Sequence, residues 1–371
     1  MAIAVVAGVR FTTEEPHAGG LERHTDTLAR ELVRLGHDVT VFAGSREELH
    51  DRDDPGVTYR IEPLVERRFV ASAAARADVS MPPERFMAEH DAYLDVMDRL
   101  DDFDAVHNNS LHYLPVVTPS RTPVVHTLHT PPTPWLESAY RIREGRRERD
   151  AAHRDGCVAS VSAANAAQWG STVDRVIHNG VELDRWCHGD GGPGAVWSGR
   201  IVPEKGPHLA IDAAVRAGLG LRIAGPVHDR AYYDDEIAPR LRAHPTVEYV
   251  GHLRIDELGA LIAQSAVAVI TPRWEEPFGL VAAEALACGT PVAAFDRGAL
   301  AEIVADDVGA LATPDDVDAL AEAIVAASTR DRSTCRQRAE ERFGSATMAR
   351  HYVEAYRVGC GVGGADGGVE R

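Results

Sequence analysis

The stretch "AVAVITPRWEEPFGLVAAEALACGTPVAAF" (residues 266–295) combines an apolar run, a short turn, a helical segment and a second apolar run. The runs AVAVIT and PVAAF are typical of buried strands. The segment FGLVAAEALACG between them ends at Gly289, and a glycine commonly ends a helix. A strand, a helix and a strand in this order indicate a unit of a parallel sheet, so this stretch predicts an α/β fold.

The same alternation runs along the rest of the chain, in two series. The first series comprises the runs IAVVAGV (3–9), LERHTDTLARELVRLG (21–36), DVTVFAG (38–44), DAVHNNS (104–110), PVVHTLH (123–129) and GCVASVS (156–162). The second begins with AVWSGR (195–200), HLAIDAAVRAG (208–218) and LRIAG (221–225). We therefore expect two doubly wound, Rossmann-like α/β domains that face each other across a central cleft.

The positions of these series predict the domain limits. We expect a Rossmann-like N-terminal domain over 1–184, a Gly-rich linker over 185–194 and a second Rossmann-like domain over 195–345. A C-terminal helix over 346–358 is expected to return toward the first domain. The Gly-rich tail over 359–371 is predicted to be disordered.

Composition narrows the class of protein. The chain has 371 residues and a formal net charge of −18, which argues against a general binder of nucleic acid or of anionic membranes. Its 5 cysteines include no C-x-x-C pair, its first apolar run has no basic leader, and no stretch has the ~20 apolar residues of a membrane span. We expect a cytoplasmic protein. The basic run RIREGRRER (141–149) is expected to be a solvated helix face, although membrane contact there stays open.

The turn and helix of residues 272–289 predict a site for an extended polar ligand. Phe278, Gly279 and Leu280 open the helix, so their N–H groups suit an anionic or oxygen-rich group, and Gly279 lets that group approach the backbone. Glu276 and Glu284 are eight residues apart, roughly 12 Å along a helix at ~1.5 Å per residue. Two carboxylates that serve one glycosidic bond lie closer, about 5–9.5 Å apart. We therefore expect these two to hold the hydroxyls at the two ends of one ligand.

Positive charge for the middle of such a ligand is available in "GRIVPEKGP" (199–207). Lys205 is the only lysine in a chain with 39 basic residues, and Arg200 lies five positions before it. A diphosphate that needs a compact ammonium group would account for this lysine, because an arginine offers a planar fork of donors instead. The alternative is an incidental surface lysine.

Further candidates lie where the other predicted strands end, because ligands of open α/β sheets bind outside the carboxyl ends of the strands. They are Gly19, Gly20, Asn108, His129, Asn179, Gly180, Gly225 and Gly251. His129 has a structural alternative, and with His126 it can form part of a metal site. No third ligand lies at a matching spacing, so we expect no metal. The Asp-x-Asp triplets at 51–53, 102–104 and 316–318 are expected by chance among 57 acidic residues.

These motifs together resemble a known family. GRIVPEKG, EPFGLVAAEALACGTPV with its Glu-x7-Glu spacing, AGGLERHTDTLARELVRLGHDVTVFA, HTLHTP and HNGVELDRW are similar to segments of the retaining GT-B glycosyltransferases of family 4. The resemblance implies an acceptor-side first domain and a second domain that binds a nucleotide-sugar donor. Pro277 is a departure, since many relatives have glycine there, and it removes one backbone N–H.

The resemblance also implies roles for individual residues. Arg200 and Lys205 would bind the donor diphosphate, Glu284 the ribose, and Glu276 with the backbone of residues 278–280 the donor sugar. Gly19 and Gly20 would approach the phosphates, with Gly225 and Gly251 also on the donor side, and His129 would lie beside the anomeric carbon. Asn108, Asn179 and Gly180 are candidates for acceptor binding or for the hinge. His129, Glu276, Arg200 and Lys205 form the expected catalytic set.

The implied activity is the transfer of a hexosyl-type sugar from a nucleotide-diphospho-sugar, expected to be a UDP-sugar, to a small-molecule acceptor. The resemblance implies retention of configuration by a front-face mechanism, without a metal or another cofactor. Three alternatives stay open. They are a UDP-sugar epimerase of similar fold, a phosphorylase with pyridoxal phosphate on Lys205, and a non-catalytic nucleotide-sugar-binding module.

Overall fold

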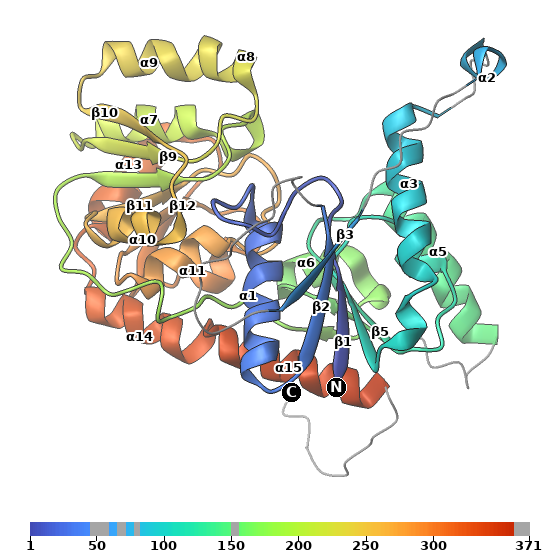
Figure 1. Ribbon diagram of the computed structural model, residues 1–371. Coiled ribbons are helices and arrows are strands. Elements are labelled where there is room, and N and C mark those ends of the chain that lie inside the picture. Colours follow the sequence, from blue (N-terminus) through green and yellow to red (C-terminus); the bar gives the residue numbers. More distant parts are fainter. Residues whose placement is uncertain (45–58, 65–71, 78–81, 150–155, 360–371) are drawn as a thin grey trace.

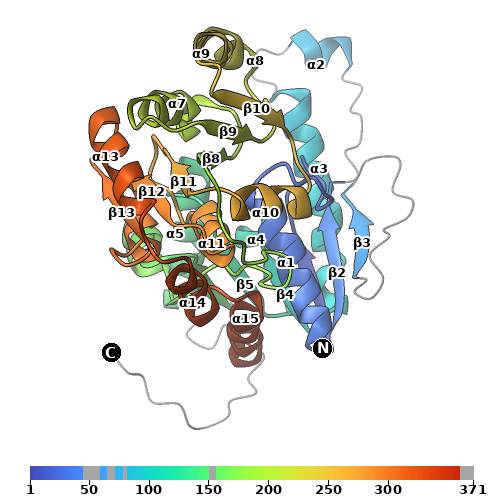
Figure 2. The ribbon, with the colours of Figure 1, turned by 90° about the vertical axis from the view of Figure 1, so that its left-hand side faces the viewer.

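The computed structural model describes residues 1–44, 59–64, 72–77, 82–149 and 156–359. Apart from Gly359, the tail predicted to be disordered lies outside these ranges. Within them the chain forms two parallel sheets with helices on their faces, and the two units stand side by side (Figures 1 and 2). This confirms the predicted pair of doubly wound α/β domains.

The first sheet has the spatial order β3-β2-β1-β4-β5-β6-β7 among the described residues. Its strands are β1 (Ala2–Val6), β2 (Asp38–Ala43), β3 (Arg60–Pro63), β4 (Ala105–Asn108), β5 (Val124–Leu128), β6 (Cys157–Ser160) and β7 (Arg175–Val176). The central strand β1 pairs in parallel with β2 and β4, with Ile3 opposite Val39 on one side and Ala105 on the other. Its helices are α1 (Gly20–Arg34), α2 (Ala73–Ala77), α3 (Glu84–Met97), α4 (Leu114–Val117), α5 (Pro134–Arg149) and α6 (Ala163–Trp169).

The second sheet repeats this order as β10-β9-β8-β11-β12-β13. Its strands are β8 (Ala195–Ser198), β9 (Leu221–Ala224), β10 (Val247–Gly251), β11 (Val267–Ile270), β12 (Val292–Phe295) and β13 (Gly309–Ala312). Its helices include α7 (Pro207–Arg216), α8 (Arg230–Tyr232), α9 (Ala238–Ala243), α10 (Ile255–Ala263), α11 (Leu280–Ala287), α12 (Leu300–Ile303), α13 (Val317–Ala327) and α14 (Arg332–Arg342). Four of the six buried residues of α11 are alanines, which lets this helix lie close to the sheet.

The last helix, α15 (Ser345–Gly359), crosses from the second domain to the first. Its residues Met348, Tyr352 and Tyr356 are buried in the same apolar cluster as Ile3 and Leu28 of the first domain. Tyr352 and Tyr356 are among the largest fully buried side chains, so α15 contributes to the first core rather than to the second.

In each sheet the strand order reverses once, between β1 and β4 in the first and between β8 and β11 in the second. Such a reversal leaves a crevice outside the carboxyl ends of the strands. The loops that follow β1, β8 and β11 therefore lie at the two crevices, and they carry most of the residues described next.

Candidate functional site

A cavity of about 260 Å³ lies between the two domains and is lined by both. The first domain contributes the loop after β1 and the segment after β5, and the second contributes the segments after β8, β9 and β11. The predicted site residues that line it are Gly19, Gly20, His129, Asn179, Arg200, Lys205, Gly225, Glu276, Phe278, Gly279 and Leu280. Residues separated by more than 200 positions in the sequence thus share one cavity.

Four predicted residues do not line this cavity. Asn108 is buried, and its side chain lies 3.1 Å from His126 Nδ1 and accepts a 2.7 Å hydrogen bond from the Ser110 hydroxyl. A Cβ atom on Gly180 would lie 2.5 Å from the Ser345 Cα atom, so this glycine permits the close approach of α15. Gly251 has a φ of 87° at the end of β10, where a left-handed turn favours glycine. The fourth residue is Glu284.

Glu284 is fully buried on α11 and forms an ion pair with Arg23 of α1, which itself lines the cavity. Its Oε2 atom has no hydrogen-bond partner among the described residues. The guanidinium of Arg23 also lies 5.5 Å from the ring centre of Trp186. A cation of the first domain therefore stands between the cavity and the carboxylate that the sequence assigns to the ribose.

Lys205 ends the short 3₁₀ helix Pro203–Lys205, and Gly206 follows with a φ of 60°. Its ammonium group donates a 2.6 Å hydrogen bond to Glu276 Oε2 and lies 5.0 Å from the ring centre of Trp274. Trp274 Nε1 donates to the same carboxylate oxygen at 3.1 Å. The structure thus joins the two charged groups that the sequence assigns to the diphosphate and to the donor sugar.

The start of α11 lines the cavity, and the first N–H groups of a helix have no partner within it. Gly279 caps this helix with a φ of 94°, and a Cβ atom there would lie 2.8 Å from Leu300 Cδ2. Only glycine meets both requirements without strain. Phe278, Gly279 and Leu280 line the cavity beside Arg200 and Lys205, so positive charge and helix N–H groups meet at one wall.

His129 follows β5 on the opposite side of the cavity. Its Nε2 lies 2.8 Å from Asn109 Oδ1, and the buried His107 Nε2 lies 2.8 Å from the same oxygen. Because an amide oxygen only accepts, both imidazoles donate from Nε2, which leaves the lone pair of His129 on Nδ1. Burial, with a smaller effect of His107, lowers the pKa of His129 to about 3. This imidazole is therefore neutral at physiological pH.

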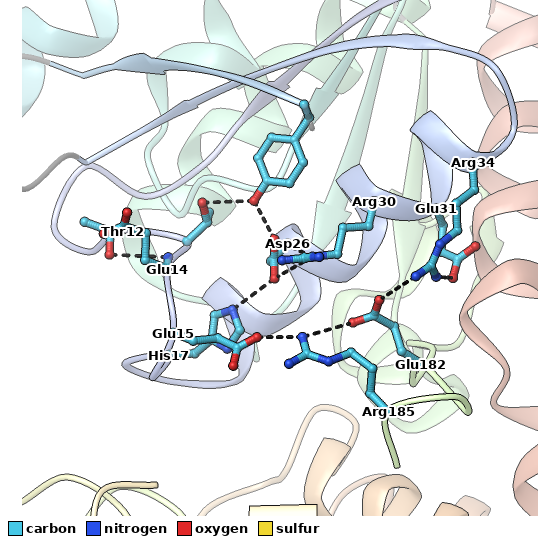
Figure 3. Close-up of polar contacts among 12 residues, drawn as sticks. Thr12, Glu14, Glu15, His17, Asp26, Arg30, Glu31, Arg34, Glu182 and Arg185 are labelled. Atoms are coloured by element: carbon cyan, nitrogen blue, oxygen red, sulfur yellow. Dashed lines mark hydrogen bonds and ion pairs between the residues drawn. The ribbon is translucent and has the colours of Figure 1, made fainter. Parts of the chain in front are cut away.

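A polar network joins the loop between β1 and α1 to Asp26 of α1 and to Arg185 of the segment between the domains (Figure 3). Glu15 accepts a 2.6 Å hydrogen bond from Arg185 Nη1 and a longer one, 3.4 Å, from the backbone N–H of Ile255. His17 pairs with Asp26 at 3.3 Å, and its carbonyl oxygen lies 3.0 Å from His252 Nε2. These contacts fix the loop that presents Gly19 and Gly20 to the cavity.

Glu182 lies in the same network, 3.9 Å from Arg185 and 3.4 Å from Arg34. Burial, with the nearby carboxylate of Asp26, raises the pKa of Glu182 to about 7. Burial alone would raise the pKa of Glu15 as well, but the hydrogen bond and charge of Arg185 leave it below its ordinary value. Glu182, in the region that joins the domains, can therefore take up a proton near neutral pH.

The cavity residues that were not predicted from the sequence include Arg23, Trp274 and His252. Arg23 lies three residues after Gly20, in the first turn of the predicted helix, and this closeness to a predicted site residue could have indicated its place in the cavity. Trp274 lies within the turn RWEEPFG, and its hydrogen bond to Glu276 is not predicted by any sequence pattern. His252 follows Gly251 directly, and no pattern distinguishes it.

Two further observations concern only the described ranges. There, no three His, Cys, Asp or Glu side chains gather in an arrangement that could hold a metal ion. In the same ranges, every helix is too short or too polar to span a membrane.

Models of two protein families match the chain, one for each half. The family described as Glycosyltransferase Family 4 matches residues 18–185, and that described as Glycosyl transferases group 1 matches residues 188–342. The two matches are adjacent and together include every strand of both sheets except β1. They also cover the motifs that suggested the family from the sequence, apart from Trp186 at the end of HNGVELDRW.

Comparison with named proteins likewise finds enzymes that transfer sugars, and the similarity extends over most of the chain. The glycogen synthase of Mycobacterium tuberculosis is 29% identical over 91% of this chain and 91% of its own length. A D-inositol 3-phosphate glycosyltransferase of Mycobacterium avium is 28% identical over 83% of this chain and 80% of its own length.

Among solved structures, Anabaena HepE in complex with UDP-glucose has a TM-score of 0.71 at 20% identity, covering 96% of this chain and 100% of that chain. The sucrose-phosphate synthase of Thermosynechococcus elongatus has a TM-score of 0.72 at 19% identity, covering 98% of this chain and 100% of that chain. At these identities the likeness establishes the fold.

Proposed function

Because the chain belongs to glycosyltransferase family 4 and has the GT-B fold, we propose that it moves a sugar from a UDP-sugar to a small-molecule acceptor with retention at the anomeric carbon. The observation that carries this proposal is the cavity between the domains. One wall of this cavity contains the cationic Arg200 and Lys205, the start of α11 and the carboxylate of Glu276. The other wall contains the neutral His129. This arrangement suits a donor with a central diphosphate.

The charged wall of the cavity would stabilise the negative charge of the leaving group. Arg200 and Lys205 would neutralise the diphosphate, with the N–H groups at the start of α11. In the structure the ammonium of Lys205 donates a hydrogen bond to Glu276. When donor binds, the diphosphate takes up the ammonium and the sugar hydroxyls donate to the carboxylate, so each charged group keeps a partner. The solved structure of HepE with UDP-glucose supports UDP as the nucleotide.

The reaction would proceed on one face of the donor sugar. The acceptor hydroxyl oxygen bonds to the anomeric carbon while the bond from that carbon to the phosphate oxygen breaks on the same side. The hydroxyl proton passes to the leaving phosphate, so no side chain acts as a base. Because burial keeps His129 neutral, its Nδ1 lone pair can accept a hydrogen bond from a sugar hydroxyl near the reacting carbon.

We further propose that transfer is independent of metal ions, because arginine, lysine and helix N–H groups supply the positive field that a metal gives elsewhere. Activity should survive treatment with a chelator. A strict requirement for added Mn²⁺ or Mg²⁺ would contradict this part of the proposal.

The decisive experiment measures binding and turnover of candidate donors. Thermal shifts with UDP-, ADP- and GDP-sugars would identify the donor, since a ligand that binds only the folded state raises its apparent stability. Slow release of free sugar and UDP without an acceptor would then separate an enzyme from a binding module. Absence of binding by every nucleotide sugar, or epimerisation of the sugar without transfer, would refute the proposal.

A further inference from the structure

Four aromatic rings form a closed circuit on the first domain, which we call the aromatic shelf and define as Phe86, His90, Tyr113 and Trp135. Phe86 and His90 lie on α3, Tyr113 caps α4, and Trp135 opens α5, so three elements meet there. Successive ring centres around the circuit are 6.4 Å apart for Tyr113–Trp135, 6.0 Å for Trp135–Phe86, 6.2 Å for Phe86–His90 and 6.1 Å for His90–Tyr113.

The angles between the rings distinguish a platform from a cage. The four neighbouring pairs have interplanar angles of 24°, 36°, 20° and 31°. A cage for a cationic ligand needs rings whose faces converge on one point. Here the Phe86–His90 and Tyr113–Trp135 pairs are stacked and the other two pairs are tilted by no more than 36°, so the ring faces do not converge on one point. The shelf therefore suits a flat ligand that stacks on it.

The shelf is accessible and firmly supported. Trp135 is 67% exposed, the highest value among the exposed large apolar side chains of the described residues. The Tyr113 hydroxyl lies 2.9 Å from His90 Nδ1, which ties α3 to the start of α4. Below, the ring of His112 stacks on Tyr113 at 4.6 Å and on the buried Tyr93 at 4.4 Å. An exposed tryptophan on a supported base costs little ordering entropy when it binds a ligand.

Two chain segments lead from the donor cavity to the shelf. Leu111 lines the cavity, is 46% exposed and precedes Tyr113 by two residues. Thr130 also lines the cavity, five residues before Trp135. At no more than ~3.6 Å per residue, the Tyr113 backbone lies within about 7 Å of that of Leu111. A ligand of one or two rings could thus contact the shelf and reach into the cavity.

The polarity of the shelf limits the class of ligand. Burial, with a smaller effect of His90, lowers the pKa of the supporting His112 to about 4, so that imidazole carries no charge at neutral pH. Aromatic faces attract the C–H face of a saturated ring, while a hydroxyl and imidazole at the edge can bond to hydroxyl groups. A neutral sugar ring has both features. A lipid chain would leave the polar groups unmatched, and an anion would find no positive partner within the shelf.

We propose that the aromatic shelf binds the acceptor, and that the acceptor is a neutral carbohydrate with one sugar ring stacked on Trp135 and Tyr113. The inference rests on the proposed transferase function, which it deepens by naming the acceptor class. The stacked sugar ring of the acceptor lies on the shelf, and a hydroxyl of the same or the next ring reaches the cavity beside His129.

The test uses the full chain saturated with UDP, and glucose, maltose, cellobiose and trehalose as probes. Saturation-transfer NMR should show the ring C–H protons of at least one saccharide in contact with the protein. Trp135→Ala should weaken that binding by about tenfold or more, whereas Trp135→Phe should retain most of it. Ile142→Ala is the matched control, because Ile142 is 50% exposed on the same helix, outside the shelf, and should change nothing.

The outcomes separate the two proposals. Equal binding of saccharides by the wild type and by Trp135→Ala, or no binding by any probe, would overturn the shelf assignment while UDP binding stays intact. Binding of choline, or of phosphatidylglycerol vesicles, that is lost in Trp135→Ala would overturn the carbohydrate assignment. If the wild type fails to bind any nucleotide sugar, the proposed function fails first. Trp135→Ala should keep the wild-type affinity for UDP, which shows that the fold is intact.

Discussion

Replacing His24 by phenylalanine should reduce the acid sensitivity of the protein. His24 is 1% exposed on α1, and neither ring nitrogen has a hydrogen-bond partner among the described residues. Its ring contacts His129 at 4.7 Å and Tyr352 at 6.3 Å between centres. Burial, with smaller effects of His129 and His107, holds the pKa of His24 well below 6.5. Phenylalanine keeps the ring contacts but cannot take up a proton.

The magnitude follows from proton linkage. A histidine with a depressed pKa in the folded state contributes stability above its unfolded pKa, near 6.5, and loses it as the pH falls. At pH 5.5 the unfolded imidazole binds almost one proton and the folded one none. The free energy of unfolding of the wild type should therefore fall by about 1.4 kcal/mol between pH 7.5 and 5.5 because of this group alone. In His24→Phe that contribution is absent.

Scanning calorimetry at the two pH values measures the effect. For a domain of this size, about 1.4 kcal/mol corresponds to a difference of about 3–5 °C in the Tm of the first domain. The gap between the Tm values at pH 7.5 and 5.5 should be narrower by that amount in His24→Phe. His351→Asn is the control, since His351 is exposed on α15. An unchanged gap in His24→Phe would refute the claim that His24 stays neutral in the folded protein.

Further predictions concern the cavity. Lys205→Ala and Arg200→Ala should each lower kcat/KM on the order of 10²-fold or more, because both side chains would stabilise the leaving diphosphate. Lys205→Arg should be impaired as well. Near-normal turnover in both alanine variants would contradict the assignment of these residues to the diphosphate. His129→Ala should lower kcat with little change in nucleotide affinity, whereas Glu284→Ala should weaken nucleotide binding. Calorimetric titration of the nucleotide, together with turnover measurements on both variants, tests whether His129 acts in turnover and Glu284 in binding. Arg23→Ala leaves the buried carboxylate of Glu284 without its cation, so it should destabilise the protein by about 3–5 kcal/mol. Combination with Glu284→Gln should restore part of that loss of Tm, and an unchanged Tm in Arg23→Ala would show that the pair does not form in solution.

The strands and helices that build the fold could be predicted from local pattern. The apolar runs at 3–9 and 266–271 became β1 and β11, and the helical period of 21–36 became α1, because side-chain periodicity records which face of an element is buried. The glycines that need a left-handed backbone, such as Gly279 at a φ of 94°, are also visible in the sequence. The order of the strands within each sheet is not a local property, and it emerged only in the structure.

By itself, the sequence determined the two α/β domains, the family and 11 of the residues that line the cavity, because short motifs at strand ends and at the start of α11 record them. Only the tertiary structure decided which distant groups meet. Arg23 and Glu284 are 261 residues apart and come from opposite domains, and the rings of the aromatic shelf come from three separate elements. No period or spacing encodes such contacts, since they depend on how whole sheets and helices pack against each other.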